Sequence, residues 1–233
     1  MKKLIYVLTA CIGLLYSCSK ESDYENVENT EYEKLAPADP KYSYLKVLNL
    51  TPGSPVSNYY IDGVKFSASL SSSGVENAGY TYNGLFPDFG YAATTPGAHK
   101  FTAKIIPTAT VDANLEVLNT TINPEAGKYY TIYTTGLYSA TNKALGAPFV
   151  LEDVKPALDT TKIFVRLVNL ATGLPNIEII PLWYANSATG APLFTVVTNA
   201  TLVKGRAYTL YLRGISGTTG TTAVTQTFYT TFF

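Results

Sequence analysis

The sequence predicts an all-β protein with two tandem β-sandwich domains, the second shorter than the first. After residue 41, short runs rich in Val, Ile, Leu, Tyr, Phe and Thr alternate with clusters of Gly, Pro, Asn, Asp and Ser. That alternation is typical of strands joined by turns, and no window in this region shows sustained helical periodicity. Two short blocks also recur in the same order, which indicates an internal repeat.

The first 17 residues have the layout of a bacterial lipoprotein signal peptide. Two lysines precede an apolar run over residues 4–16, which is too short to span a bilayer as a helix. The run ends in the sequence LYSC, which resembles a lipobox with Cys18 as the lipidated residue. No Cys follows it, so an intramolecular disulfide cannot explain this thiol. We therefore expect residues 1–17 to be removed and the chain to be held to a membrane by lipid on Cys18.

Residues 18–40 predict a disordered acidic tether. Seven of the chain's 17 acidic residues lie between residues 19 and 40, without apolar periodicity. Ser19 replaces the Asp that retains lipoproteins in an inner membrane, and the acidic cluster resembles the export signal of surface lipoproteins in Bacteroidetes-type bacteria. We expect an outer-membrane lipoprotein exposed at the cell surface, and a plain spacer on a periplasm-facing lipoprotein is the alternative.

Two blocks of the remaining sequence occur twice. KVLNLTPGSP at residues 46–55 matches RLVNLATGLP at residues 166–175. GKYYTIYTTG at residues 127–136 matches GRAYTLYLRG at residues 205–214. The preserved order indicates a tandem duplication, and the shorter spacing in the second copy indicates that material between its blocks has been trimmed.

The predicted domain boundaries follow from this repeat. The first sandwich covers residues 41–156 and the second, trimmed sandwich covers residues 157–233, with the linker at residues 155–161. Within the first, Asp62-Gly63 predicts a tight hairpin turn, and Pro96-Gly97 precedes a strand over residues 99–106.

Each repeated block predicts a strand whose side chains alternate between two faces. In the first block, Leu45 and Val47 share one face and Lys46 lies on the other. In the second block, Tyr130 follows closely after Gly127. A Tyr in this place is typical of the tyrosine corner of immunoglobulin-like sandwiches, in which the hydroxyl bonds the backbone. We therefore expect two immunoglobulin-like β-sandwiches.

The segments VLNLTPGSP, YYIDG, PGAHKFTAKI and EAGKYYTIYTTG, in this order and spacing, resemble the DUF4397 family of secreted and surface β-sandwich domains. The resemblance covers residues 44–136 well and residues 163–214 as a degenerate second copy. Members of this family are common in Bacteroidetes lipoproteins. The resemblance implies a fold and a place in the cell envelope, and it carries over no catalytic residues.

The composition offers little material for catalysis. The chain has one His, two Cys and a formal net charge of zero. A Ser-His-Asp triad would need His99, for which a strand position at the solvent edge is the simpler reading, and no Ser lies in a Gly-x-Ser-x-Gly turn. Nothing in the sequence pairs two carboxylates as a glycosidase requires, and zero net charge argues against nucleic-acid binding. We expect a protein that is not an enzyme, with no cofactor and no metal site.

Aromatic residues are the remaining signal for a ligand. A glycan or a protein could bind to an exposed aromatic patch, because such rings combine apolar area with hydrogen-bonding groups. The core of the sandwich is the competing location for these rings. The candidate patch consists of Tyr80, Tyr82, Phe86, Phe89 and Tyr91.

Two further features concern the linker and the C-terminus. Asp159-Thr160-Thr161 resembles the short acceptor of bacterial O-glycosylation, which predicts Thr160 as the modified residue. The C-terminal sequence TQTFYTTFF predicts a strand that pairs either within the chain or with a neighbouring subunit.

Together these observations predict a lipid-anchored cell-envelope lipoprotein with a non-catalytic binding or adhesion role at the cell surface. The alternative is a structural or fimbria-like envelope assembly subunit that exchanges strands.

Overall fold

The computed structural model describes residues 35–157, 159–161, 164–174, 177–180, 183–186, 192–194 and 203–231. These residues form an all-β protein, as predicted, with one short 3₁₀ turn, η2 (Gly220–Thr222), in the described part. Among the described residues, no helix is long and apolar enough to cross a membrane. The predicted signal peptide, Cys18 and the tether up to residue 34 lie outside the described residues.

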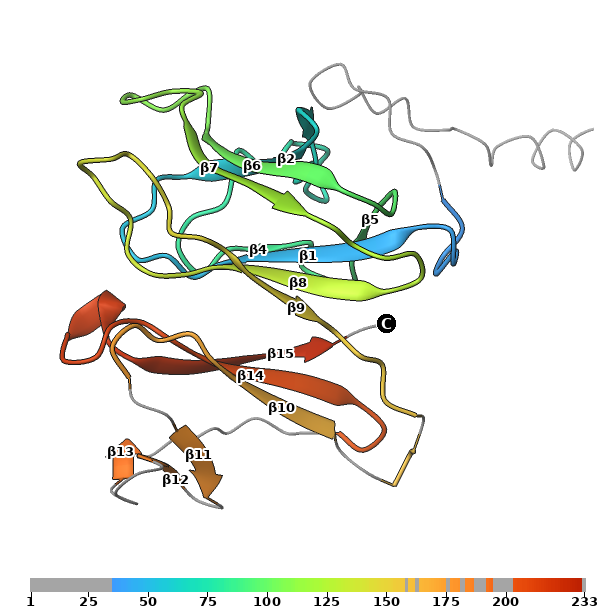
Figure 1. Cartoon of the computed structure of the whole chain (residues 1–233), viewed down its shortest axis with the longest axis vertical. Coiled ribbons are helices and arrows are strands. Elements are labelled where there is room, and N and C mark those ends of the chain that lie inside the picture. Colours follow the sequence, from blue (N-terminus) through green and yellow to red (C-terminus); the bar gives the residue numbers. More distant parts are fainter. Residues whose placement is uncertain are drawn as a thin grey trace, which may run out of the picture.

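The first unit is a sandwich of two sheets (Figure 1). One sheet, here called the central sheet, has the order β4-β1-β8-β9, and β5 also pairs with β1. Its strands are β1 (Ser43–Asn49), β4 (Leu85–Phe86), β5 (Ala92–Thr94), β8 (Tyr129–Thr134) and β9 (Phe149–Glu152). The other, the outer sheet, has the order β3-β2-β6-β7. Its strands are β2 (Ser57–Ile61), β3 (Val64–Lys65), β6 (His99–Ile105) and β7 (Glu116–Ile122).

The core of the first unit lies between these two sheets. Leu45 and Val47 share one face of β1, as predicted, and this face points into the core, where Ile132 joins them from the neighbouring β8. Tyr59 and Phe101 enter from the outer sheet with stacked rings whose centroids are 5.7 Å apart. The predicted hairpin is also present, since β2 and β3 pair around Asp62-Gly63.

The second unit repeats the central sheet. Its three-stranded sheet, here called the second-unit sheet, has the order β10-β14-β15. The strands are β10 (Phe164–Asn169), β14 (Ala207–Arg213) and β15 (Thr225–Thr231). In place of an outer sheet, its described residues form a separate three-stranded sheet from β11 (Ile177–Ile180), β12 (Trp183–Asn186) and β13 (Pro192–Phe194).

The two pairs of repeated blocks form strand pairs with the same register. β1 and β8 run parallel with Lys46 opposite Thr131, and β10 and β14 run parallel with Arg166 opposite Thr209. These are the equivalent pairs that the two sequence blocks define. The pairing partner of Thr131 on β9 is Leu151, and that of Thr209 on β15 is Tyr229. β9 and β15 are therefore equivalent strands, although they lie outside the two matching sequence blocks.

Both units also contain the predicted tyrosine corner. The Tyr130 hydroxyl accepts a hydrogen bond from the backbone N–H of Glu125 at 3.3 Å. The Tyr208 hydroxyl accepts the equivalent bond from the N–H of Val203 at 2.9 Å. These bonds tie the start of each second-block strand to the turn that precedes it, which is the structural role expected of such a tyrosine.

The second-unit sheet packs on the face of the central sheet that points away from the first core. Leu48 and Tyr133 of the central sheet form one apolar cluster with Val168 and Tyr211 of the second-unit sheet. In Figure 1 the outer, central and second-unit sheets follow one another as three layers. Because β1 is covered on both sides, all seven of its residues are buried, including Lys46.

The C-terminal strand pairs within its own chain. β15 lies antiparallel to β14 through seven residue pairs, from Ala207 opposite Thr231 to Arg213 opposite Thr225. An exchange of this strand between subunits would therefore first have to break this ladder.

Candidate functional site

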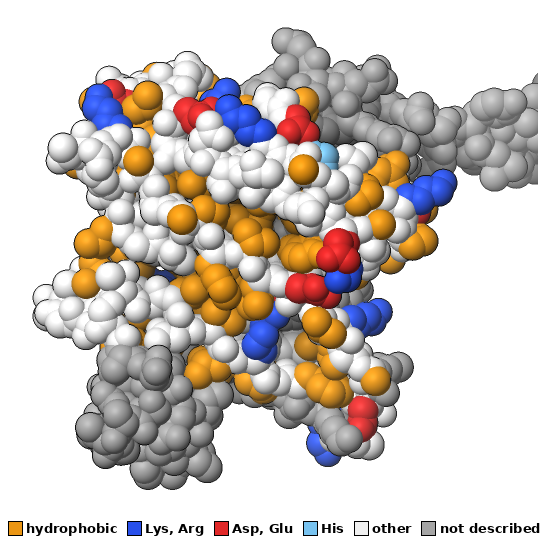
Figure 2. Space-filling view, viewed as in Figure 1, with side chains coloured by type: hydrophobic (Ala, Val, Ile, Leu, Met, Phe, Trp, Pro, Cys, Tyr) orange, Lys and Arg blue, Asp and Glu red, His pale blue; other side chains and the backbone are white. Residues whose placement is uncertain are grey.

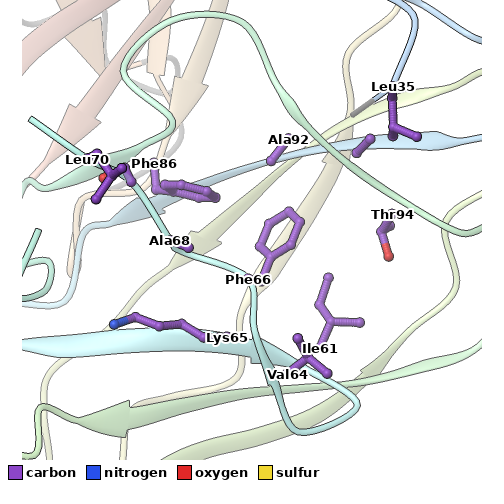
Figure 3. Close-up of a pocket in the computed structure, with 12 residues that line it drawn as sticks. Leu35, Ile61, Val64, Lys65, Phe66, Ala68, Leu70, Phe86, Ala92 and Thr94 are labelled. Carbon is purple, nitrogen blue, oxygen red and sulfur yellow. The ribbon is translucent and has the colours of Figure 1, made fainter. Parts of the chain in front are cut away.

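An apolar pocket of about 600 Å³ opens at one edge of the first sandwich (Figure 3). It lies where the edges of both sheets of the sandwich come together, between β3 on one side and β4 and β5 on the other. The lining residues are Leu35, Ile61, Val64, Lys65, Phe66, Ala68, Ser69, Leu70, Phe86, Ala92, Ala93 and Thr94. Its volume falls within the range usual for small-molecule sites in proteins.

Short strands and small side chains leave this space open. β3 and β4 each have two residues, and the chain between them contributes loop residues in place of a longer edge strand. Alanines at positions 68, 92 and 93 line the space without filling it. In Figure 3, Phe66 lies near the middle, with Phe86, Ala68 and Leu70 toward one end and Thr94 and Leu35 toward the other.

Two packed aromatic rings, Phe66 and Phe86, form part of the pocket wall. Phe66 and Phe86 meet edge to face with centroids 5.4 Å apart, a geometry that aromatic pairs prefer. Phe86 is also packed in the core against Tyr80, at 5.6 Å. The wall of the pocket is therefore an extension of the hydrophobic core.

Two of the polar groups in the lining are already engaged by the protein. The Lys65 ammonium forms an ion pair with Glu76. The Ser69 hydroxyl lies 3.1 Å from the Tyr80 hydroxyl, within hydrogen-bond distance. A ligand in this pocket would therefore meet mainly apolar surface, because these polar side chains have partners.

His99 fixes one end of the pocket. Its Nδ1 is 2.6 Å from Oδ2 of Asp62, and its Nε2 is 2.7 Å from the carbonyl oxygen of Thr95. Asp62 lies in the turn between Ile61 and Val64, and Thr95 follows Thr94, so the bridge ties together chain segments that line the pocket. The hydrogen bond from His99 lowers the pKa of Asp62.

Both ring nitrogens of His99 are engaged within the protein. Nδ1 faces the carboxylate of Asp62, and Nε2 faces the carbonyl oxygen of Thr95, with the Thr95 hydroxyl 3.3 Å from the same nitrogen. His99 therefore acts as a structural link between the turn at Asp62 and the segment that follows β5.

The five predicted patch residues do not form one exposed surface. Tyr80 and Phe86 are buried in the core, and Phe86 also lines the pocket. The Tyr91 hydroxyl donates to Asp153 at 2.9 Å, and the Tyr82 ring lies under Arg213 of the second unit, 5.2 Å from its guanidinium carbon. Phe89 has 81% of its surface exposed. Packing in the core and between the units therefore accounts for four of the five rings.

The other predicted site residues lie apart from the pocket. Thr160 is exposed in the linker, and Asp159 beside it accepts hydrogen bonds from the backbone and hydroxyl of Thr161. Cys18 lies outside the described residues. Among the residues that the structure describes, no three His, Cys, Asp or Glu side chains form a group that could hold a metal ion.

The pocket was not predicted from the sequence. The available signal was the sequence VKFSASL at residues 64–70, in which small residues alternate with apolar ones after a hairpin. That pattern also fits an ordinary strand, so only the two-residue length of β3 revealed the opening.

Comparison with known proteins places the chain in a family. The search of curated proteins found no match. A family model described as "Domain of unknown function (DUF4397)" matches residues 43–180, which include the whole first sandwich and β10 and β11 of the second unit. This match covers more than half of the 233 residues and agrees with the resemblance seen in the sequence motifs. The chain belongs to the DUF4397 family.

Proposed function

We propose that this protein is a lipid-anchored lipoprotein of the cell envelope that binds a ligand at the cell surface without catalysis. The observation that carries the proposal is the apolar pocket at the edge of the first sandwich. A concave, mainly apolar site with few polar groups is the usual form of a small-molecule binding site.

The lining indicates the chemistry of the ligand. Sugars need many hydrogen-bonding partners, but Lys65 and Ser69 of the lining are engaged by Glu76 and Tyr80. An apolar ligand, or an apolar group of a larger one, would gain by leaving water and would leave no polar group of its own unpaired. The proposed ligand therefore presents a hydrocarbon or aromatic group to Phe66.

The pocket is also well placed for an anchored binding protein. Leu35 lines it and lies where the acidic segment of residues 19–34 joins the sandwich. On this proposal, lipid on Cys18 and the acidic segment hold the pocket near the membrane, where apolar ligands are concentrated.

A fluorescent apolar probe tests the pocket. N-phenyl-1-naphthylamine should bind to the wild-type chain and gain fluorescence. Ala68→Phe should abolish this gain, because the new ring fills the space beside Phe66. Ala113→Phe, which adds the same ring at an exposed loop position, is the matched control and should keep wild-type binding. Equal binding by the wild type and Ala68→Phe would refute the pocket as the site.

Two cell experiments test the anchor and the location. Cys18→Ala should release the protein from the membrane fraction. Protease added to intact cells should degrade the wild-type protein, because the proposal places it on the outer surface. Protection until the outer membrane is opened would contradict surface exposure but would leave the pocket proposal standing.

A further inference from the structure

The two repeat copies pack against each other through equivalent residues. The apolar cluster between them contains Leu48, Leu50 and Tyr133 from the first copy and their equivalents Val168, Leu170 and Tyr211 from the second. Leu151 and Tyr229, which occupy equivalent register positions on β9 and β15, join the same cluster. An interface to which both partners contribute the same surface is the type that joins the subunits of two-fold symmetric dimers.

The polar contacts at this interface are asymmetric. Arg166 of the second copy forms an ion pair with Asp153 of the first and donates to the carbonyl oxygen of Glu152 at 3.3 Å. Asp153 is buried and also accepts hydrogen bonds from Thr131 at 2.5 Å and Tyr91 at 2.9 Å. This carboxylate is therefore built into the face of the first unit.

Lys46, the equivalent of Arg166, does not have the equivalent partner. In the first copy, Asp153 lies opposite Tyr129, and its N–H donates to the carbonyl oxygen of Tyr129. The equivalent of Tyr129 in the second copy is Ala207, and the residue opposite Ala207 is Thr231. The second copy therefore has Thr231 where the first copy has the carboxylate of Asp153. Lys46 instead donates to the carbonyl oxygen of Pro87 at 3.1 Å. Its ammonium lies over two rings, 5.3 Å from the centroid of Tyr91 and 5.5 Å from that of Tyr229. Among the described residues, Lys46 has no carboxylate within ion-pair distance.

We infer that the face of the central sheet that carries Lys46 and Asp153 is a docking surface for a second copy of this chain. In a two-fold pair of first units, each Lys46 would meet Asp153 of the other copy. The charge contact that Arg166 makes once with Asp153 within the chain would thus be made twice in the pair, by Lys46 of each copy. The second unit occupies this surface within the chain and competes with the second copy.

Competition sets the condition for pairing. A covalently linked partner has an effective concentration in the millimolar range when its linker is short, so the second unit excludes a second chain at micromolar protein. Figure 2 shows apolar side chains where the two units meet. Detachment of the second unit would expose the buried part of this surface and make it available to another chain.

Val168→Asp tests this inference in the exported chain carrying Cys18→Ala. Val168 is 8% exposed in the apolar cluster, so a carboxylate there should detach the second unit. We expect light scattering to give the monomer mass for the parent at micromolar protein and twice that mass for the variant. Val165→Asp is the matched control, because Val165 is 47% exposed on the same strand, and it should remain monomeric.

Small-angle X-ray scattering decides what a monomeric Val168→Asp variant would mean. A monomer with an expanded shape, in which the units are apart, would overturn the inference. If the shape is unchanged, the second unit has not detached, and Tyr211→Asp is then used to detach it. An expanded monomer of that variant would likewise overturn the inference. Adding Leu48→Asp to the dimeric variant should restore the monomer, and a dimer that survives this change would also overturn the inference.

A charge reversal tests the predicted contact itself. In the detached variant, Lys46→Asp should abolish dimerisation, because it places a carboxylate opposite Asp153 of the other copy. Combining it with Asp153→Lys should restore dimerisation, because the pair is re-formed with reversed polarity. Failure of this rescue in a folded protein would contradict the Lys46–Asp153 contact between copies.

Discussion

The two copies of the repeat share a strand register but bury their sheets in different ways. In the first copy, the central sheet is covered on one side by the outer sheet and on the other by the second unit. The described part of the second-unit sheet keeps the parallel strand pair and the tyrosine corner. Gly127 and Gly205 also keep similar left-handed φ values, 72° and 78°. The comparison indicates that this strand pair with its corner is the conserved element of the duplication, since it survives the trimming.

The pocket and the docking face depend on different parts of the first unit. The pocket lies between the edges of the outer and central sheets, so it depends on a region whose counterpart in the second copy is shorter and, in its described residues, forms β11–β13. The docking face instead depends on the strands that both copies retain. Evidence against the pocket as a ligand site would therefore leave the docking-face proposal standing, and evidence against the docking face would leave the pocket proposal standing.

The largest expected difference between the copies is in core packing. Ile132 is fully buried in the first unit, and its equivalent Leu210 is half-buried. Ile132→Ala should lower the free energy of unfolding by about 3–4 kcal/mol, the range for a large cavity in a packed core. Leu210→Ala should cost about half as much. Urea denaturation measures both, and equal losses would show that the two sheets are equally well covered.

The next largest effect concerns Arg166. Arg166→Met should lower the free energy of unfolding by about 3 kcal/mol, because it leaves the buried carboxylate of Asp153 without its ionic partner. Asp153→Asn made together with Arg166→Met should recover part of this loss. Denaturation of the single and double variants provides the test, and additive losses would show that the two residues do not act as a pair.

Lys46→Met, at the position equivalent to Arg166, should instead raise the free energy of unfolding. Burial is the main cause that lowers the pKa of Lys46 to about 8, so its charge opposes folding at neutral pH. Relief of this cost amounts to about 3 kcal/mol. Loss of the bond to Pro87 and of the ring contacts offsets part of it, which leaves a net gain of about 1–2 kcal/mol at pH 7.

The pH dependence checks the sign of this effect. The unfolded chain binds more protons at Lys46 than the folded chain between about pH 8 and 10.5, so wild-type stability from this group rises across that window. The advantage of Lys46→Met should therefore shrink over the same window. A difference that does not change with pH would exclude lysine burial as its cause.

The smallest expected effect is at the tyrosine corners. Tyr130→Phe and Tyr208→Phe each remove one hydrogen bond to a backbone N–H and should each cost about 1 kcal/mol. Similar losses would support equal structural roles in the two copies. Thermal unfolding measures them, and Tyr138→Phe, at a residue packed against the first core outside either corner, is a suitable control.

Stability should also fall in alkaline solution. Burial raises the pKa of Tyr211 to about 12, and burial likewise raises the pKa of Tyr133. Below pH 10 both phenols are protonated in the folded and the unfolded chain, and above pH 10 the unfolded chain loses these protons first. The contact between the units, to which both rings contribute, should therefore weaken above about pH 10.

Local and periodic features made much of the fold predictable. The repeat, the alternation around Lys46, the hairpin at Asp62-Gly63 and the tyrosine after Gly127 each reflect a constraint within a few residues of the chain. Such constraints can be read from sequence because they follow from backbone geometry and from the alternation of side chains along a strand.

The sequence by itself determined the all-β class, the family and the equivalent strands of the two copies. Only the tertiary structure decided which faces those strands bury. It covered Lys46, took Tyr80 and Phe86 into the core, and left the edge between β3 and β5 open as a pocket. The physical reason is that alternation assigns a side chain to a face of a sheet, whereas the partner that covers that face comes from residues far away in the chain.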